Sequence, residues 1–309
     1  MSLSESQAIP GLHHVAAISG PAQDNLEFWT GTLHQRLVKR TVNFDDSGTY
    51  HLYYGDNDAA PGSIMTFFPF VHMGPSGAGA GIASAVAYAI SNLDQRMGNL
   101  AEAAINFDGP FERFGERAIA LNDPDGLRVE LIERGARDEG FHSVTFWLDE
   151  IEPTATVPEA MGYKREADET ITTGGTSGIE IRLRYSSIGP ERGSAVDLMV
   201  PDTRSIGRAG AGTIHHVAFR ARTVEEQQVW RRRLSGIGRD VTSVINRQYF
   251  DAIYFYTLGG VSFEIATDPP GFSVDEYADH LGEALKQPEK YEADRARIEK
   301  VLPEIRVPA

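Results

Sequence analysis

The stretch Gly11-Leu12-His13-His14-Val15-Ala16 occurs again in a closely similar form, Thr213-Ile214-His215-His216-Val217-Ala218, toward the other end of the 309-residue chain. In both copies two histidines stand between aliphatic residues, a pattern typical of a strand that enters an apolar core. A carboxylate within an otherwise apolar run, Gly260-Val261-Ser262-Phe263-Glu264-Ile265, follows the second copy. Two histidines and one such carboxylate can form a metal site with open coordination positions. The fold must bring them together for that to happen.

The histidine doublets open the first and the last of four similar units in the chain. Turn residues separate β-rich runs, and each unit shows the order strand, helix and three strands, βαβββ, with a short helix in the third. Helices are expected at 21–29, 92–104, 150–161 and 224–234. Equivalent positions of the opening strands hold His14, Ala85, Ser143 and His216, and those of the closing strands, each four residues after a glycine, hold Thr66, Glu130, Asp197 and Glu264.

These repeats predict an α+β fold in which four βαβββ modules form two half-barrel domains, each a curved sheet with helices outside. Along the sequence the modules divide into two pairs, residues 1–140 and 141–268. If one metal needs both His14 and His216, the first and the last module must share one half-barrel. The two middle modules must then pair with each other.

A C-terminal helical tail is predicted at 269–309, because Pro269-Pro270-Gly271 interrupts the last strand. The charged composition of this segment predicts helices at 274–286 and 289–301. Such a tail is either a solvated helix pair or a lid over the site, and the sequence leaves both interpretations open.

Composition limits the classes of protein to which the chain can belong. Hydrophobic residues make up 41% and charged residues 24%, as in ordinary soluble domains. The 29 lysines and arginines against 44 acidic residues give a net charge of −15, which argues against affinity for nucleic acids or anionic membranes. The absence of cysteine excludes disulfides, thiolate metal sites and cysteine nucleophiles. Without a signal peptide or an apolar run long enough to span a bilayer, a cytoplasmic location is expected, and a homo-oligomer remains open.

The alternation of side chains along a strand predicts which histidine of each doublet faces the concave side of its sheet. Val217 and Phe219 suit the side packed against helices, so His216 lies on the concave side, and His14 does so by the same count. Glu264 is expected on that side as well. Two neutral imidazoles and a carboxylate suit Fe(II) with positions left for substrate and oxygen. Zn(II) accepts the same donors with a water molecule, and Mn(II) also fits the ligand types.

A lone strand histidine is more often a hydrogen-bonded core residue than a metal ligand. Here the doublet is duplicated and accompanied by a carboxylate in an apolar strand, where an unpaired charge is unfavourable, so the metal interpretation is preferred. Glu130 and Asp197 lack partner imidazoles, which predicts that the two middle modules are a metal-free copy. His142, aligned with the first histidine of each doublet, is interpreted as a packed strand residue.

The chain resembles the vicinal oxygen chelate superfamily, which includes glyoxalases, bleomycin-resistance proteins and extradiol dioxygenases. More narrowly, it resembles ring-cleaving dioxygenases that act on hydroquinones and chlorohydroquinones. The resemblance covers both ends of the chain and is weakest across the third module. It is carried by the residues at 11–14, 40–45, 50–54, 61–69, 247–250, 253–255 and 259–264.

This resemblance implies that Fe(II) is held by His14, His216 and Glu264. It also implies that four further residues, His13, His215, Arg247 and Tyr254, act near the substrate oxygens. Strand alternation alone would point both His13 and His215 away from the metal, so strand twist or a β-bulge must reconcile the two expectations. The chain departs from the family at Ala16, where a hydroxyl residue is usual, and we expect this change to affect substrate choice or protonation.

The leading functional hypothesis is a non-haem Fe(II)-dependent, extradiol-type dioxygenase that uses O₂ to cleave a dihydroxylated aromatic such as a hydroquinone. The first alternative is a glyoxalase-like lyase or isomerase that uses Zn²⁺, Ni²⁺ or Mn²⁺. Such sites usually have a fourth protein ligand, for which Thr66 is a poor candidate. The second alternative is a protein of the same fold that binds a small molecule without catalysis.

Overall fold

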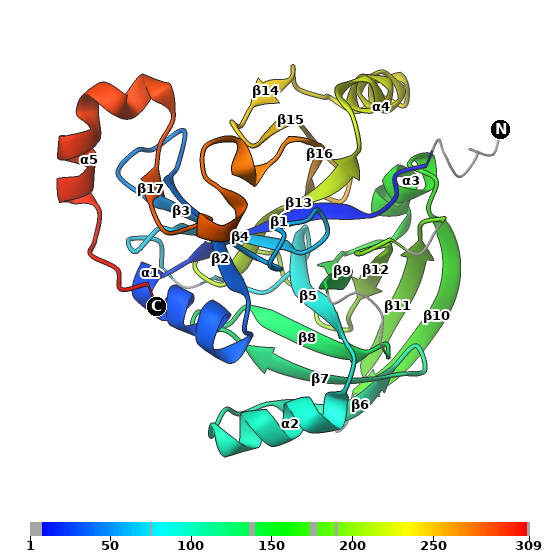
Figure 1. Cartoon of the computed structure of the whole chain (residues 1–309). Coiled ribbons are helices and arrows are strands. Elements are labelled where there is room, and N and C mark those ends of the chain that lie inside the picture. Colours follow the sequence, from blue (N-terminus) through cyan, green and yellow to red (C-terminus); the bar gives the residue numbers. More distant parts are fainter. Residues whose placement is uncertain (1–7, 75, 136–139, 174–177, 189–190, 308–309) are drawn as a thin grey trace.

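Two curved β-sheets form the frame of the protein, and the helices lie mainly around their outer sides (Figure 1). The computed structural model describes residues 8–74, 76–135, 140–173, 178–188 and 191–307. No helix within these ranges is both long and apolar enough to cross a bilayer.

The first sheet has nine strands, eight from the first and fourth modules and one, β17, from the C-terminal tail. Its spatial order is β14 (Ile245–Asn246), β15 (Phe250–Tyr256), β16 (Ser262–Pro270), β13 (Thr213–Ala221), β1 (Leu12–Ser19), β4 (Ile64–Pro69), β3 (Tyr50–Gly55), β2 (Arg36–Val42) and β17 (Leu285–Lys286). Strand β1 runs antiparallel to β13 and parallel to β4, and β13 runs parallel to β16. The two histidine doublets are therefore on adjacent strands.

The second sheet has eight strands and is built from the second and third modules. Its spatial order is β10 (Lys164–Thr173), β11 (Gly178–Ser186), β12 (Ala195–Val200), β9 (Gly140–Trp147), β5 (Ile82–Ile90), β8 (Arg128–Glu133), β7 (Glu116–Asn122) and β6 (Asp108–Arg113). The predicted α+β fold with two half-barrels is confirmed, and so is the pairing of the first module with the last. Each sheet takes one module from residues 1–140 and one from 141–268.

Each module contributes one helix, and the ends of two of these helices are fixed by side-chain caps. The Asn92 side chain accepts a hydrogen bond from the backbone N–H of Gln95, and that of Thr223 accepts one from Glu226. Caps of this kind satisfy backbone donors that the first helical turn leaves free. The helices are α1 (Ala22–Glu27), which continues as a π-helical turn (Phe28–Thr32), α2 (Leu93–Glu102), α3 (Glu152–Ala160) and α4 (Val224–Gly236).

The main hydrophobic core lies on the convex side of the first sheet and includes residues of the second sheet, such as Val86 and Val129. Val15 on β1 and Val217 and Phe219 on β13 are completely buried in it. Burying each such side chain contributes about 1.5–3 kcal/mol. Because side chains alternate along a strand, the core positions leave His14 and His216 for the concave side.

The C-terminal tail differs from the prediction in its first half. Residues 274–286 do not form a helix: 3₁₀ turns at Phe272–Val274 and Ala278–His280 precede β17, which pairs with β2. Gly282 has a φ of +82°, and a Cβ there would lie 2.1 Å from the carbonyl oxygen of Leu37. A glycine in this conformation, pressed against a neighbouring strand, is incompatible with a continuous helix.

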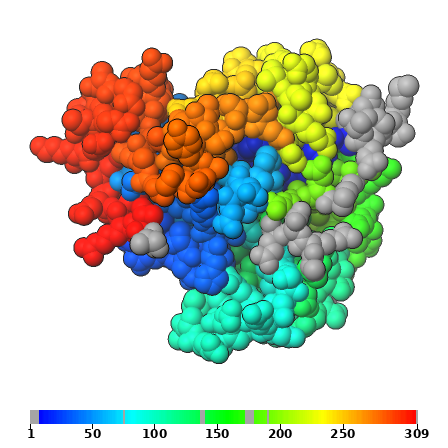
Figure 2. Space-filling model, in the orientation of Figure 1, coloured from blue at the N-terminus to red at the C-terminus, as the bar shows by residue number. Residues whose placement is uncertain are grey.

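The second half of the tail is helical as predicted, although its first turns are tighter than an α-helix. A 3₁₀ segment (Glu289–Asp294) leads into α5 (Arg295–Val301). Figure 2 shows the tail, orange to red, packed against the blue N-terminal module. The tail therefore lies along the β2 edge of the sheet that carries both histidine doublets, where its Phe272 and Leu281 pack in one cluster with Tyr53 and Phe250.

Candidate metal centre

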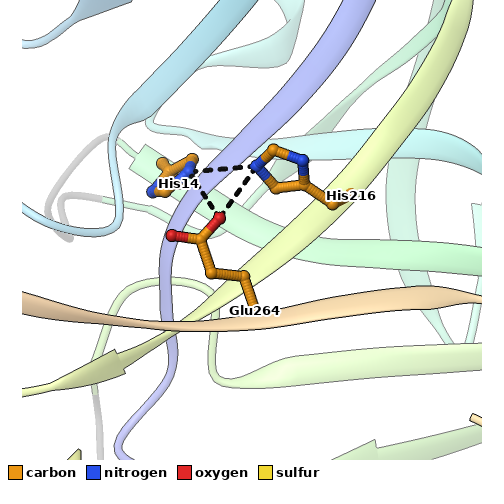
Figure 3. A group of neighbouring side chains, drawn as sticks. All are labelled: His14, His216 and Glu264. Carbon is orange, nitrogen blue, oxygen red and sulfur yellow. Dashed lines mark hydrogen bonds and ion pairs between the residues drawn. The ribbon is translucent and has the colours of Figure 1, made fainter. Parts of the chain in front are cut away.

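Three strands bring His14, His216 and Glu264 to one point on the concave side of the first sheet (Figure 3). Nε2 of His216 lies 2.9 Å from Oε2 of Glu264, and Nε2 of His14 lies 3.5 Å from the same oxygen. The two Nε2 atoms are 3.4 Å apart. All three side chains are buried, and their ligand atoms lie within 4.8 Å of one another, so they could hold a metal ion together.

The first histidine of each doublet also faces this side, contrary to the expectation from simple alternation. The register between β1 and β13 shifts at two places. His13 has no partner on β13 between the pairs of Leu12 and His14, and His215 has no partner on β1 between the pairs of Ala16 and Ala17. His13 and His215 are thus the extra residues of two β-bulges, each of which turns a side chain that would otherwise point away. Of the two explanations that the sequence left open, strand twist or a β-bulge, the structure shows a bulge in both doublets.

The two bulges place an imidazole behind each candidate ligand. Nδ1 of His13 lies 2.9 Å from Nδ1 of His14, and Nδ1 of His215 lies 2.8 Å from Nδ1 of His216. A metal-binding Nε2 must be unprotonated, so Nδ1–H of each ligand histidine would donate to the histidine before it. Outer partners of this kind fix the ring orientation and tautomer of a ligand.

The surroundings of His13, His215 and His216 favour the neutral form of each imidazole. Burial lowers the pKa of His216, and burial with the neighbouring His14 lowers the pKa of His13 well below its usual value. Burial and His216 lower the pKa of His215 to about 4.

Glu264 is a fully buried carboxylate whose nearest ionisable partners are the imidazoles of His14 and His216. Burial alone would raise its pKa, but His14 and His216 outweigh burial and hold the pKa well below its usual range. Among the described residues no lysine or arginine is paired with Glu264, and neither carboxylate oxygen accepts a well-formed hydrogen bond. A buried charge in this state is unfavourable unless a cation compensates it, so the donor set fits a divalent metal ion.

A cavity of about 320 Å³ opens beside the three side chains. Arg247 and Tyr254 line it, with Nε of Arg247 donating to the Tyr254 hydroxyl at 3.1 Å. Arg247 also pairs with Asp45 at 3.0 Å. Burial and the nearby Glu264 raise the pKa of Tyr254, so its phenol stays protonated. The other walls of the cavity are mainly aromatic: Phe44, Tyr53, Phe68, Phe70, Phe250 and Tyr256.

All seven predicted site residues are therefore close together, and six of them line the cavity or contribute a ligand atom. His13 lies behind His14. Ala16 is completely buried, paired with His216 and Thr66 on the neighbouring strands, and is not among the cavity-lining residues. None of the lining residues comes from the tail, so in this structure the tail is not a lid over the cavity.

His51 and Tyr53 also line the cavity, although neither was predicted from the sequence to be a site residue. Both lie on β3, and their spacing of two residues puts them on the same face of that strand. Both residues belong to the stretch 50–54, which carries part of the family resemblance. Strand alternation within this stretch could have predicted that they face the same side.

The middle modules replace the candidate metal site by an internal ion-pair network. Arg113 is buried between Glu130 and Asp197 and is paired with both carboxylates. Asp197 also accepts from Nε of Arg184 at 2.8 Å. His142 is a buried strand residue in contact with Ser143, as predicted. The guanidinium of Arg113 thus lies between the two carboxylates that occupy, in the middle modules, the position of Glu264.

Paired βαβββ modules with a two-histidine, one-carboxylate cluster define a class of proteins that can hold a metal in a curved sheet. Residues 11–131 match the Glyoxalase/Bleomycin resistance protein/Dioxygenase superfamily. The chain is 38% identical over 312 residues to the Bacillus subtilis protein named "Putative ring-cleaving dioxygenase MhqO", with 94% of this chain and 95% of that protein covered. It is 31% identical over 304 residues to the chlorohydroquinone/hydroquinone 1,2-dioxygenase of Sphingobium indicum, with 91% and 92% covered. The chain belongs to this superfamily.

Solved structures agree with this assignment. A crystal structure from Bacillus subtilis, described as a "putative dioxygenase", is 36% identical and superposes with a TM-score of 0.85, covering 98% of this chain and 99% of that one. Glyoxalase I from Zea mays has a TM-score of 0.64 at 14% identity, with 85% and 94% covered, and shows a likeness of fold alone. The resemblance predicted from the sequence is confirmed.

Proposed function

We propose that this protein is a non-haem Fe(II)-dependent dioxygenase of the extradiol type that cleaves the ring of a dihydroxylated aromatic such as a hydroquinone. The observation that carries the proposal is the meeting of His14, His216 and Glu264 beside a cavity with aromatic walls. Relatives along nearly the whole chain are named ring-cleaving dioxygenases, one of them for hydroquinone and chlorohydroquinone, which supports aromatic ring cleavage.

The ligand set favours Fe(II) as the resident metal, with His14, His216 and Glu264 as its protein ligands. Bound Fe(II) would supply neighbouring open positions for a substrate oxygen and O₂, together with the reducing electrons that activate O₂. Two neutral imidazoles and one carboxylate leave a divalent ion with a formal charge of +1, which favours a phenolate over a neutral phenol. Mn(II) or Zn(II) would satisfy the same donors.

Arg247 and Tyr254 are proposed to act on the substrate oxygens. Because Nε–H of Arg247 donates to the Tyr254 hydroxyl oxygen, the phenolic proton of Tyr254 is directed elsewhere and can serve the substrate. Nearby Tyr254 and Asp45 raise the pKa of Arg247 despite burial, so its guanidinium remains charged and can stabilise negative charge that develops on the ring. His13 and His215 hold the ligand imidazoles in orientation.

The aromatic walls have two functions in this proposal. Side chains such as Phe68 and Phe250 offer faces on which a planar ring can pack. They also exclude water from the cavity, which strengthens the interactions of Arg247 and Tyr254 with a charged oxygen.

The experiment that tests the proposal is metal quantitation combined with oxygen-electrode assays of hydroquinones and catechols on anaerobically loaded protein. We expect one iron per chain, O₂ consumption with hydroquinones, and both atoms of ¹⁸O₂ in a ring-opened product identified by mass spectrometry. Iron-loaded protein that consumes no O₂ with any of these diols would overturn the proposal.

The same experiment discriminates the two other activities that this fold supports. A glyoxalase-like lyase or isomerase would be active with Zn²⁺, Ni²⁺ or Mn²⁺ and would not consume O₂. Thr66, where a fourth ligand would be expected, already has its hydroxyl against Nε2 of His51, which speaks against that chemistry. A protein that only binds small molecules would bind a diol without any product.

A further inference from the structure

Tyr53 occupies the same place in the first module that Tyr254 occupies in the fourth. Tyr254 on β15 is paired with Glu264 on β16, and Tyr53 on β3 is paired with Thr66 on β4. Glu264 and Thr66 are the equivalent closing-strand positions of the two modules. The internal repeat therefore places two phenols in one cavity, one from each module of the first sheet.

The Tyr53 hydroxyl belongs to a hydrogen-bonded chain of three side chains. Its oxygen lies 2.8 Å from Nδ1 of His51, and the other ring nitrogen of His51 contacts the Thr66 hydroxyl. The His51 ring is held between Tyr53 and Phe68, with ring centroids 4.0 and 4.2 Å away. Both the position and the rotation of this imidazole are thus fixed.

Only one proton arrangement of this chain leaves a donor for the cavity. Burial, reinforced by nearby His14, lowers the pKa of His51 well below its usual value, so the ring is neutral and donates through one nitrogen. If the Thr66 hydroxyl donates to Nε2, then Nδ1–H donates to the Tyr53 oxygen, and the Tyr53 proton is available to a ligand. Hydrogen bonds aligned in this direction also strengthen one another.

Resting on the proposed function, we propose that Tyr53 is a second catalytic phenol of this site, which donates a hydrogen bond to the second ring oxygen of a diol. His51 is the positioning residue that aims this phenol by donating to its oxygen, with its other ring nitrogen against the Thr66 hydroxyl. The site thereby selects aromatic rings with two oxygen substituents over rings with one.

Packing contacts alone do not explain this arrangement. The Tyr53 ring does pack against Phe272 and Tyr249, with centroids 5.2 and 6.1 Å away. Those contacts involve the ring and would be equally available to phenylalanine. They require neither the hydroxyl nor its alignment with His51 and Thr66, so the substitution Tyr53→Phe isolates the hydroxyl.

The test measures the affinities of anaerobic, Fe(II)-loaded protein for hydroquinone and for phenol, which has the same ring but a single oxygen. We expect Tyr53→Phe to weaken hydroquinone binding about five- to tenfold, the effect of one hydrogen bond, while phenol binding stays within about twofold. Tyr54→Phe is the matched control, because the Tyr54 hydroxyl donates to buried Asn25 at 2.9 Å, away from the cavity. Its affinities for both compounds should remain those of the unmodified protein.

A second variant tests the positioning role. His51→Phe should reduce the preference for hydroquinone over phenol as much as Tyr53→Phe does, and the double variant should lose little more than either single variant. The proposal is wrong if Tyr53→Phe leaves the preference unchanged, if affinity for both compounds falls equally, if the two losses add, or if the unmodified protein does not prefer hydroquinone. These outcomes differ from failure of the proposed function, which shows as an absence of O₂ consumption whatever the affinities are.

Discussion

Glu264 and Glu130 occupy equivalent positions in two modules, but their surroundings give them different roles. Glu264 faces two imidazoles, whereas Glu130 is paired with the buried guanidinium of Arg113. The same carboxylate position thus serves a candidate metal site in one sheet and an internal ion pair in the other. The difference lies in the neighbouring strands, which supply histidines only to Glu264.

Replacing Glu264 by glutamine should abolish stoichiometric iron binding without unfolding the protein. The change keeps the shape of the side chain but removes the only carboxylate of the ligand set. We expect the iron affinity to fall by more than the about 10- to 100-fold that loss of an outer partner causes. Iron content per chain, measured after anaerobic loading and desalting, checks this prediction.

The matched control for that variant is Glu130→Gln in the middle modules. It should retain iron, while its stability falls by about 1–3 kcal/mol because Arg113 loses a charged partner. Full iron occupancy in Glu264→Gln, or equal iron loss in both variants, would contradict the assignment of the metal ligand.

The sequence predicted which metal-binding residue types share one side of the sheet. It did not predict the direction of side chains at positions where the strand is irregular. His14, His216 and Glu264 could be selected because alternation along regular strands predicts the face of each side chain. His13 and His215 could not be placed in this way, because a β-bulge inserts one residue and changes the face of its side chain. No residue type marks such a bulge, so the sequence predicted only that a bulge or strand twist must reconcile alternation with the family resemblance.

At the scale of elements, the strands and helices followed from turn residues and periodicity, but the segment 274–286 did not. Its composition permits a helix, whereas its structure is decided by contacts with a strand far away in sequence. Lys39 of β2 is completely buried and binds Asp275 and Glu276. A tertiary ion pair of this kind is invisible in the local pattern, and it overrides weak helix propensity.

The Lys39 ion pairs should determine how firmly the tail is held. In Lys39→Met, Asp275 and Glu276 lose their cation, and we expect about 3 kcal/mol of destabilisation, localised to the tail. Phe272 packs against the cavity-lining Tyr53, with ring centroids 5.2 Å apart, so loss of this contact when the tail detaches should also weaken hydroquinone binding. Limited proteolysis should cut the tail faster in this variant than in the unmodified protein.

Lys300→Met is the appropriate control for the tail, since Lys300 is exposed on α5. Its proteolysis rate should match that of the unmodified protein. If Lys39→Met unfolds the whole chain in one transition while the tail resists proteolysis, the tail is not a separately held element.

Arg113 should be a main determinant of the stability of the second sheet. Burial lowers its pKa to about 10, which leaves the guanidinium charged at neutral pH, between two buried carboxylates. Arg113→Met preserves much of the side-chain volume but leaves Glu130 with Arg128 and Asp197 with Arg184 as their remaining cations, and we expect about 3 kcal/mol of destabilisation in urea unfolding. Arg117→Met, which breaks exposed pairs with Asp94 and Glu133, should remove less than about 1 kcal/mol.

The same substitution should weaken the response of stability to acid. Burial alone would raise the pKa of Asp197, but Arg113 and Arg184 lower it below its usual value. The pairing therefore stabilises the fold above the unfolded-state pKa of about 3.9, and this contribution is lost as pH falls through the lower folded-state pKa. In Arg113→Met the pKa of Asp197 should rise toward its usual value because only Arg184 still lowers it, so the variant should lose less stability than the unmodified protein as pH falls below about 3.9. A variant as stable as the unmodified protein at neutral pH would show that the buried guanidinium is dispensable.

At the scale of the whole molecule, the candidate metal site ties together the two ends of the chain. His14 comes from the first module and His216 and Glu264 from the fourth, whereas the middle modules form a sheet with its own ion-pair network. This pairing could be inferred from the sequence because one metal ion cannot bind both doublets unless their modules share a sheet. The division of the chain into its first and second halves gives no hint of it.

Removing the metal should therefore loosen the first sheet and leave the second sheet intact. A ligand that binds only the folded state stabilises it by about 2.7 kcal/mol at a concentration of 100 times Kd, so chelator-treated protein should melt several degrees lower than the iron-loaded form. Hydrogen exchange should lose protection in β1, β13 and β16 and keep it in β5, β8, β9 and β12. Anaerobic addition of Fe(II) should restore both the melting temperature and the protection, but not in Glu264→Gln. Equal loss of protection in both sheets would mean that the metal supports the fold generally and does not join its first and last modules.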